Sequence, residues 1–212
     1  MNTYIINNPT DLEKFKDEAG CRCDGNLEVN CSLDFKGRLL VDGFLSSRAG
    51  GYIKAGEYIR AGGFIKAGEY IEAGGSIEAG GSIEAGRYIK AGGSIEAGGF
   101  IRAGRYIKAG WSIKAGEYIE AGWSFGISAG LFISCKDTLK FGLKVFAGIC
   151  TWRKITDEEK TITCGKFEGG ELAYGILKET GIVSKQDIVL IDGKEWSAST
   201  IKQALKKYAN EL

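Results

Sequence analysis

The chain has 212 residues and is almost electrically neutral, with 28 lysines and arginines against 27 acidic residues. A balance this close gives no reason to expect nucleic acid or an acidic membrane as the partner. Histidine is absent, which removes the most common general acid–base residue and the most common metal ligand of proteins. Any enzyme built on this chain would rely on carboxylates, lysine, tyrosine or cysteine.

Residues 1–20 lack the basic start and apolar core of a signal peptide, and no segment has the apolar length that spans a membrane. We therefore expect a cytoplasmic protein. Its six cysteines lie in a chain too large to need disulfide cross-links, so we expect reduced and mostly buried thiols. Cys21, Cys23 and Cys31 lack the spacing and the fourth ligand of a zinc site, so we expect no metal and no cofactor.

Residues 1–25 are expected to form an N-terminal cap with a short helix near Asp11–Glu18, because Asn8-Pro9-Thr10 is a typical helix start. From residue 26 on, apolar residues recur at a six-residue step, although the residue types vary. The larger inward residues of this segment predict a wide, less regular first turn. Two extra residues around Ala49–Gly51 then shift the register into a perfect repeat.

Residues 52–123 consist of twelve hexapeptides without an insertion. Position two is always Ile, position three is charged, position four is Ala and position five is Gly, whereas positions one and six vary. Ile and Ala, two residues apart, point to the same face of a strand, with the charged residue on the other face. Glycine supplies the positive φ or the close packing that a corner requires. Each hexapeptide is therefore one short strand and one corner.

Stacked units of this kind predict a mainly β fold, a single-stranded β-solenoid over residues 26–135. Three strands per 18-residue turn sort the variable positions best, because like residues then stack on like residues. Position one gives a column of four tyrosines at Tyr52, Tyr70, Tyr88 and Tyr106. Position three gives a column of charges that contains Lys54, Glu72, Lys90 and Lys108.

Hexapeptide repeats resemble those of the left-handed β-helix acyltransferases, which implies a solenoid fold. Here the small Ala follows Ile, whereas the small residue of those enzymes precedes the aliphatic one, and the chain lacks the histidine base they use. We therefore expect no acyltransferase and no enzyme. The short, glycine-punctuated strands of residues 26–135 also resemble bactofilins, which implies a cytoskeletal β-helix that forms polymers.

Past Trp123 the six-residue pattern dissolves, and residues 124–153 are interpreted as terminal strands that begin to close the open end of the solenoid. Residues 136–212 are expected to form a small α+β cap or docking module. Its predicted elements are a hairpin around Gly169-Gly170, a strand in residues 187–196, and a final helix. Ile201, Leu205 and Tyr208 lie at helical spacing in that last segment.

The candidate interaction residues are the four tyrosines, three lysines near them and two tryptophans late in the repeat: Tyr52, Tyr70, Tyr88, Tyr106, Lys54, Lys90, Lys108, Trp111 and Trp123. The tyrosine–lysine strip is typical either of stacked bases and phosphates or of a ladder that only stabilises neighbouring turns. Trp111 and Trp123 favour an interaction patch near one end. We find no catalytic, cofactor-binding or metal-binding constellation.

The leading hypothesis is a non-enzymatic rigid rod that binds a protein partner through its faces, its ends or its C-terminal module, as a scaffold or as an inhibitor of mobile-element origin. Two alternatives stay open. The solenoids stack end to end into filaments, or the tyrosine–lysine strip binds nucleic acid or a nucleotide. The neutral charge balance disfavours nucleic acid.

Overall fold

The computed structural model describes residues 1–18, 20–181, 188–191 and 194–197. The chain divides into two units, Met1–Thr180 and Gly181–Leu212. In the second unit, β26 (Ile188–Ile191) and β27 (Lys194–Ser197) pair as an antiparallel hairpin. The predicted final helix lies outside the described residues.

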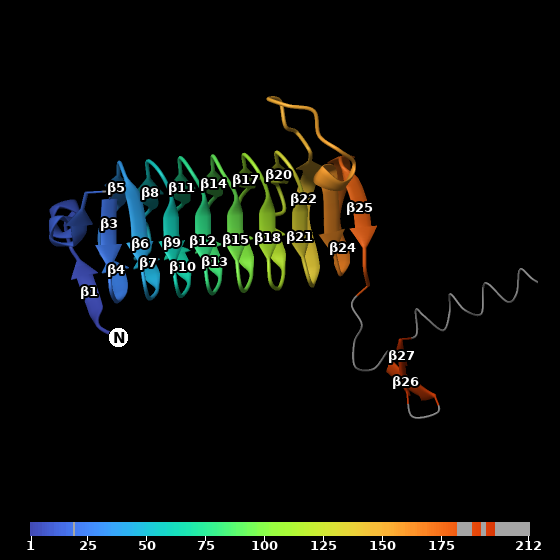
Figure 1. The fold of residues 1–212 in the computed structure, drawn as a ribbon, viewed down its shortest axis with the longest axis horizontal. Coiled ribbons are helices and arrows are strands. Elements are labelled where there is room, and N and C mark those ends of the chain that lie inside the picture. Colours follow the sequence, from blue (N-terminus) through green and yellow to red (C-terminus); the bar gives the residue numbers. More distant parts are fainter. Residues whose placement is uncertain (19, 182–187, 192–193, 198–212) are drawn as a thin grey trace, which may run out of the picture. The chain divides into compact units, whose positions relative to one another are not determined.

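The first unit is a β-solenoid whose short strands stack in parallel along three faces (Figure 1). The first face holds, in chain order, β1 (Thr3–Ile6), β4 (Asn26–Val29), β7 (Leu45–Ser47), β10 (Ile65–Ala67), β13 (Ile83–Ala85), β16 (Ile101–Ala103) and β19 (Ile119–Ala121). The second face holds β5 (Leu33–Phe35), β8 (Ile53–Ala55), β11 (Ile71–Ala73), β14 (Ile89–Ala91), β17 (Ile107–Ala109) and β20 (Ile127–Ala129).

The third face closes each turn. It holds β3 (Gly20–Cys23), β6 (Arg38–Val41), β9 (Ile59–Ala61), β12 (Ile77–Ala79), β15 (Ile95–Ala97), β18 (Ile113–Ala115), β21 (Ile133–Cys135), β23 (Thr161–Cys164) and β25 (Ile176–Glu179). Successive strands of the chain thus visit the first, second and third face in order.

The register between turns confirms three strands per 18-residue turn. Ile71 pairs with Ile53 on one side and with Ile89 on the other. The isoleucines of the repeat are fully buried and the alanines are at most 8% exposed, so the two residues fill one continuous core. Burial of an isoleucine side chain contributes roughly 1.5–3 kcal/mol, which makes this core the main source of stability.

Between β4 and β22 (Thr138–Ala147), two turns contain 20 residues in place of 18, and both gain their extra residues at the corner between the first and the second face. The turn that carries residues 148–157 is longer still, because Ile133 pairs with Ile162. The predicted insertion near Ala49–Gly51 is present, because Leu33 pairs with Ile53, twenty residues on. A second insertion at Trp123-Ser124 makes Ile107 pair with Ile127. The six-residue step therefore resumes after Trp123, two residues out of phase, which corrects the expectation that it dissolves there.

The parallel stacking also continues across residue 135. Two long strands, β22 (Thr138–Ala147) and β24 (Lys166–Tyr174), each bend from the first face to the second. They pair with each other in parallel, so the hairpin expected around Gly169-Gly170 is wrong. Gly170 lies where β24 turns the corner, and a Cβ there would lie 2.0 Å from the carbonyl oxygen of Leu143.

At the N-terminus the structure differs from the predicted cap. The residues expected to form a helix near Asp11–Glu18 form a 3-10 helix, η1 (Pro9–Phe15), and then β2 (Lys16–Asp17), which pairs antiparallel with β3. The carboxylate of Asp11 accepts hydrogen bonds from the backbone N–H groups of Asn7 and Asn8, which lowers its pKa. These bonds fix a short first turn, and Leu12 is buried in the core.

The invariant corner glycine is required by close packing and not by a positive φ. A Cβ added at Gly80 would lie 2.1 Å from the carbonyl oxygen of Gly62, one turn earlier. At Gly81, the next residue, the nearest heavy atoms would be 3.3 Å away. Among the described glycines, none at position five of the repeat has a positive φ. Position five therefore excludes side chains, whereas position six accepts Glu, Arg and Trp elsewhere in the repeat.

This difference predicts that Gly80→Ala lowers the free energy of unfolding by about 1–3 kcal/mol, because the methyl group overlaps a backbone oxygen. The matched control Gly81→Ala changes it by less than about 0.5 kcal/mol. Urea unfolding of the two variants and the parent measures both values. Equal losses at the two positions would contradict the packing explanation.

Candidate functional site

Tyr52, Tyr70, Tyr88 and Tyr106 form one stacked ladder, as the 18-residue spacing predicts. The ring centroids of successive tyrosines are 4.6, 4.7 and 4.9 Å apart, and the rings are within 6° of parallel. Each tyrosine immediately precedes a strand of the second face, so the ladder follows the corner between the first and second faces. Both faces of the Tyr70 and Tyr88 rings are covered by neighbouring rings. Only the two end rings, Tyr52 and Tyr106, have a face for another planar group.

Burial within the ladder changes the acidity of its tyrosines. Desolvation raises the pKa of Tyr88 to about 12, and the nearby carboxylate of Glu72 adds to the shift. The Tyr88 hydroxyl donates a hydrogen bond to Glu72 at 3.4 Å. Desolvation also raises the pKa of Tyr70. The interior of the ladder is thus held in the neutral phenol form.

A neutral Tyr88 makes the solenoid sensitive to high pH. The pKa of an unfolded tyrosine is about 10, so this stabilisation is complete below about pH 10 and is lost as the pH rises through about 12. We expect ultraviolet titration of tyrosinate to show a late phase near pH 12 that is lost in Tyr88→Phe. In Glu72→Gln this phase should move to lower pH. A titration curve that is identical in all three proteins would contradict the assignment.

The three candidate lysines lie on the second face, but they differ in whether an acidic side chain pairs with them. Lys54 forms an ion pair with Asp34 at 3.3 Å, and Lys90 forms one with Glu72 at 3.1 Å. Among the described residues, Lys108 has no ion-pair partner, because its strand neighbours are Lys90 and Ser128. Lys108, at the C-terminal end of the tyrosine ladder, is therefore a cation without a counter-charge in the part of the chain that the structure describes.

The two candidate tryptophans are strongly exposed but lie at different corners. Trp111, 55% exposed, follows β17 at the corner between the second and third faces. Trp123, 76% exposed, follows β19 at the corner of the tyrosine ladder, and the Lys140 ammonium lies 5.4 Å from the centre of its ring. The fold therefore places both in the C-terminal turns without bringing them to one point.

Other apolar side chains are exposed in the same turns, and of these sequence reasoning placed Phe132 near the two tryptophans but missed Leu143, Ile149 and Trp152. Together with the two tryptophans they form what we call the aromatic end surface: Trp111, Trp123, Phe132, Leu143, Ile149 and Trp152. Trp152 is 57% exposed, and its ring lies over Gly130, one turn back at the same corner. The sequence did contain a signal for Trp152: it lies between Thr151 and Arg153, outside the six-residue step, where no core position is expected.

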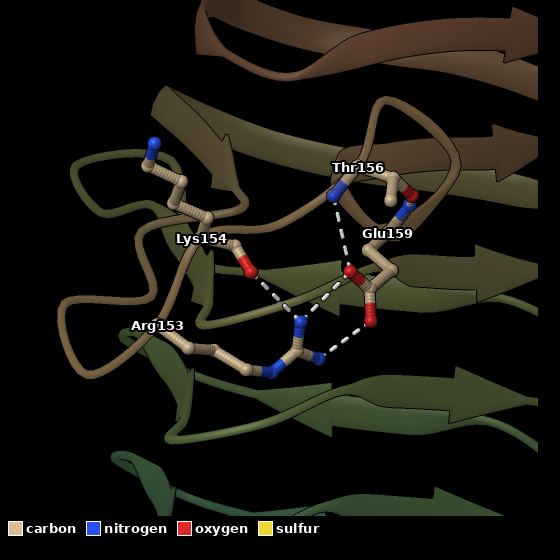
Figure 2. Close-up of polar contacts among 4 residues, drawn as sticks. All are labelled: Arg153, Lys154, Thr156 and Glu159. Atoms are coloured by element: carbon tan, nitrogen blue, oxygen red, sulfur yellow. Dashed lines mark hydrogen bonds and ion pairs between the residues drawn. The ribbon is translucent and has the colours of Figure 1, made fainter.

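Trp152 is presented by a loop, residues 148–157, that projects from the corner between β22 and β23 (Figure 1). Arg153 and Glu159 hold this loop together (Figure 2). The Arg153 guanidinium donates to the Glu159 carboxylate and to the Lys154 carbonyl oxygen, and Glu159 also accepts from the Thr156 N–H at 3.0 Å. These hydrogen bonds lower the pKa of Glu159 to about 2, so the carboxylate stays charged at neutral pH. The loop is therefore a fixed part of the surface.

The buried cysteines offer little nucleophilic chemistry. Desolvation raises the pKa of Cys21 and Cys164 to about 11 and that of Cys135 to about 12, so these thiols stay protonated at neutral pH. All six cysteines are free. In the described part of the chain, no group of cysteines and carboxylates has a metal-binding arrangement. Nor is any described helix long and apolar enough to cross a membrane.

A broad groove of about 860 Å³ follows the third face. Glycines 62, 80, 98 and 116 line its floor together with the charge column of that face. In this column the guanidinium of Arg60 is hydrogen-bonded to the carboxylate of Glu78. The repeated charges and glycines of this groove single out no residue for chemistry.

Comparisons with protein families, with curated proteins and with solved structures find no match to this chain.

Proposed function

We propose that this chain is a non-enzymatic rigid rod that binds a protein partner through the aromatic end surface. The observation that carries the proposal is the concentration of exposed tryptophans in the last turns, with Trp111, Trp123 and Trp152 all more than half exposed. Tryptophan is among the residue types most enriched in binding hot spots, and large exposed aromatic side chains are more common at protein interaction sites than on the rest of a protein surface.

The rest of the solenoid supports this role by making the surface rigid. Every turn rests on its neighbour through parallel strand pairing and stacked side chains, and the Arg153–Glu159 pair fixes the one projecting loop. A surface that is ordered before binding loses little conformational entropy when it binds. Such a rod suits a scaffold or an inhibitor that covers a groove of its partner. Six free thiols favour a reducing compartment, and we place the protein in the cytoplasm.

The test uses the tagged full-length chain and chemical cross-linking in its native host, followed by affinity measurements with the isolated partner. We expect cross-links within the last turns. The triple variant Trp111→Ser, Trp123→Ser, Trp152→Ser should weaken binding more than tenfold, because hot-spot side chains contribute at least about 2 kcal/mol.

Phe64→Ser provides the control, because Phe64 is 41% exposed in an earlier turn and lies outside the aromatic end surface. This variant should bind like the parent. A partner that cross-links elsewhere on the rod and tolerates the triple tryptophan substitution would refute the assignment of this surface.

Self-assembly is a second candidate function, and the ends of the solenoid favour it. Within the described residues no strand pairs with the outer edge of β24 or β25, and β1 is likewise an edge strand at the other end. Parallel edges of this kind can extend a sheet from one copy to the next. The bactofilin-like repeat also implies polymers.

Light scattering decides between the two functions. Filament formation predicts a scattered mass that rises with protein concentration across the micromolar range. Binding of a separate partner through the aromatic end surface predicts a constant mass, with binding stoichiometry set by the partner. A monodisperse species at tens of micromolar would remove the filament candidate.

A further inference from the structure

The tyrosine ladder ends abruptly at its C-terminal side, although the strands continue. Ile127 is the strand neighbour of Ile107, so Gly126 occupies the place where a fifth tyrosine would follow Tyr106. A cavity of about 430 Å³ lies at this point. We call it the slot; it is lined by Tyr106, Lys108, Gly126, Ile127, Ser128, Leu143, Lys144 and Phe146.

The slot has room for one planar ring. Val145 pairs with Ile127, so Lys144 occupies the ladder position after Gly126. Two strand spacings, about 9–10 Å, therefore separate the backbone at Tyr106 from the backbone at Lys144. One ring inserted between them would stack on Tyr106 at a spacing close to that of the ladder, 4.6–4.9 Å. Leu143 and Phe146 supply apolar walls.

The charges around the slot favour a ring that carries a negative group. Lys108 lines the slot and, within the described residues, has no ion-pair partner. Lys144 is paired with Glu171 at 3.2 Å, so it contributes a second ammonium group that is already partly compensated. An anionic substituent on the bound ring would supply the counter-charge that Lys108 lacks.

The opposite end of the ladder differs in its charges and serves as an internal comparison. Ser32 precedes Leu33, the strand neighbour of Ile53, and so lies beside Tyr52. The nearby Lys54 is already paired with Asp34. In the described part of the chain, the Tyr106 end therefore combines a cavity and a ladder ring with a lysine that has no ion-pair partner, whereas the lysine at the Tyr52 end is paired.

We propose that the slot binds a small planar aromatic anion of the mononucleotide class, with its ring as the fifth rung of the tyrosine ladder and its phosphate at Lys108. Since the interior rings cover one another, the ladder can stack a further ring only at its ends and offers no track for a polynucleotide. The proposal concerns residues other than the tryptophans of the partner surface and does not depend on that function.

The experiment titrates the full-length chain with adenosine monophosphate, adenosine and ribose 5-phosphate, using calorimetry and amide NMR shifts. We expect saturable binding of the monophosphate, with the largest shifts at Ser128 and Lys144. Adenosine lacks the charged phosphate and ribose 5-phosphate lacks the aromatic base. Each should therefore bind about tenfold more weakly than the monophosphate.

Matched variants separate the slot from the ladder as a whole. Tyr106→Ala should lose about tenfold or more in affinity, and Lys108→Gln should abolish the preference for the monophosphate over adenosine. Tyr52→Ala removes a ring from the other end of the same ladder and should bind normally. Equal losses in the two tyrosine variants, or equal affinities for the monophosphate and ribose 5-phosphate, would overturn the proposal. So would a single-stranded oligonucleotide that binds far more tightly than the mononucleotide and shifts amides along the whole second face.

Discussion

The spacing between adjacent turns, set by the hydrogen bonds of parallel strands, governs every other feature of this solenoid. At the corners it brings the backbone of one turn against the carbonyl oxygen of the turn before, so that Gly80 has no room for a Cβ above Gly62. On the surface the same spacing places tyrosine rings 4.6–4.9 Å apart, close enough to stack. Inside, the isoleucines and alanines of successive turns stack into one continuous core. Residues invariant in the repeat are those that touch the neighbouring turn through backbone or core.

Because the constraint is periodic, much of the fold could be predicted from the sequence. The strand positions, the three faces, the 18-residue turn and the tyrosine ladder all follow from positions that recur. The prediction was wrong where the period is interrupted. Two extra residues at Trp123-Ser124 keep the inside–outside alternation of the strands but shift the six-residue step. The sequence after them therefore no longer matches the repeat, although the solenoid continues. Long strands such as β22, which cross a corner at Gly142, have no counterpart in the repeat.

The candidate site was predicted less well than the fold, and for a related reason. The column of tyrosines could be predicted, but whether a ring face is free depends on what occupies the next turn, as Gly126 does beyond Tyr106. Whether an acidic side chain lies opposite Lys108 likewise depends on the residue twenty positions later, which is Ser128. Trp152 belongs to no column of the repeat. Its position over Gly130 depends on the path of the loop, which no periodic position specifies. Surface chemistry in this protein lies where the repeat is broken.

The two insertions, at Ala49-Gly50 and at Trp123-Ser124, lie at the same corner because the twelve hexapeptides between them make four complete turns. The number of hexapeptides therefore sets both the length of the solenoid and the direction in which its last turns face. Gain or loss of three hexapeptides would lengthen or shorten the rod and leave the ends facing the same directions. Gain or loss of one hexapeptide would rotate the last turns by one face relative to the first. Duplication in multiples of 18 residues can thus change the reach of the first unit without changing what its two ends present.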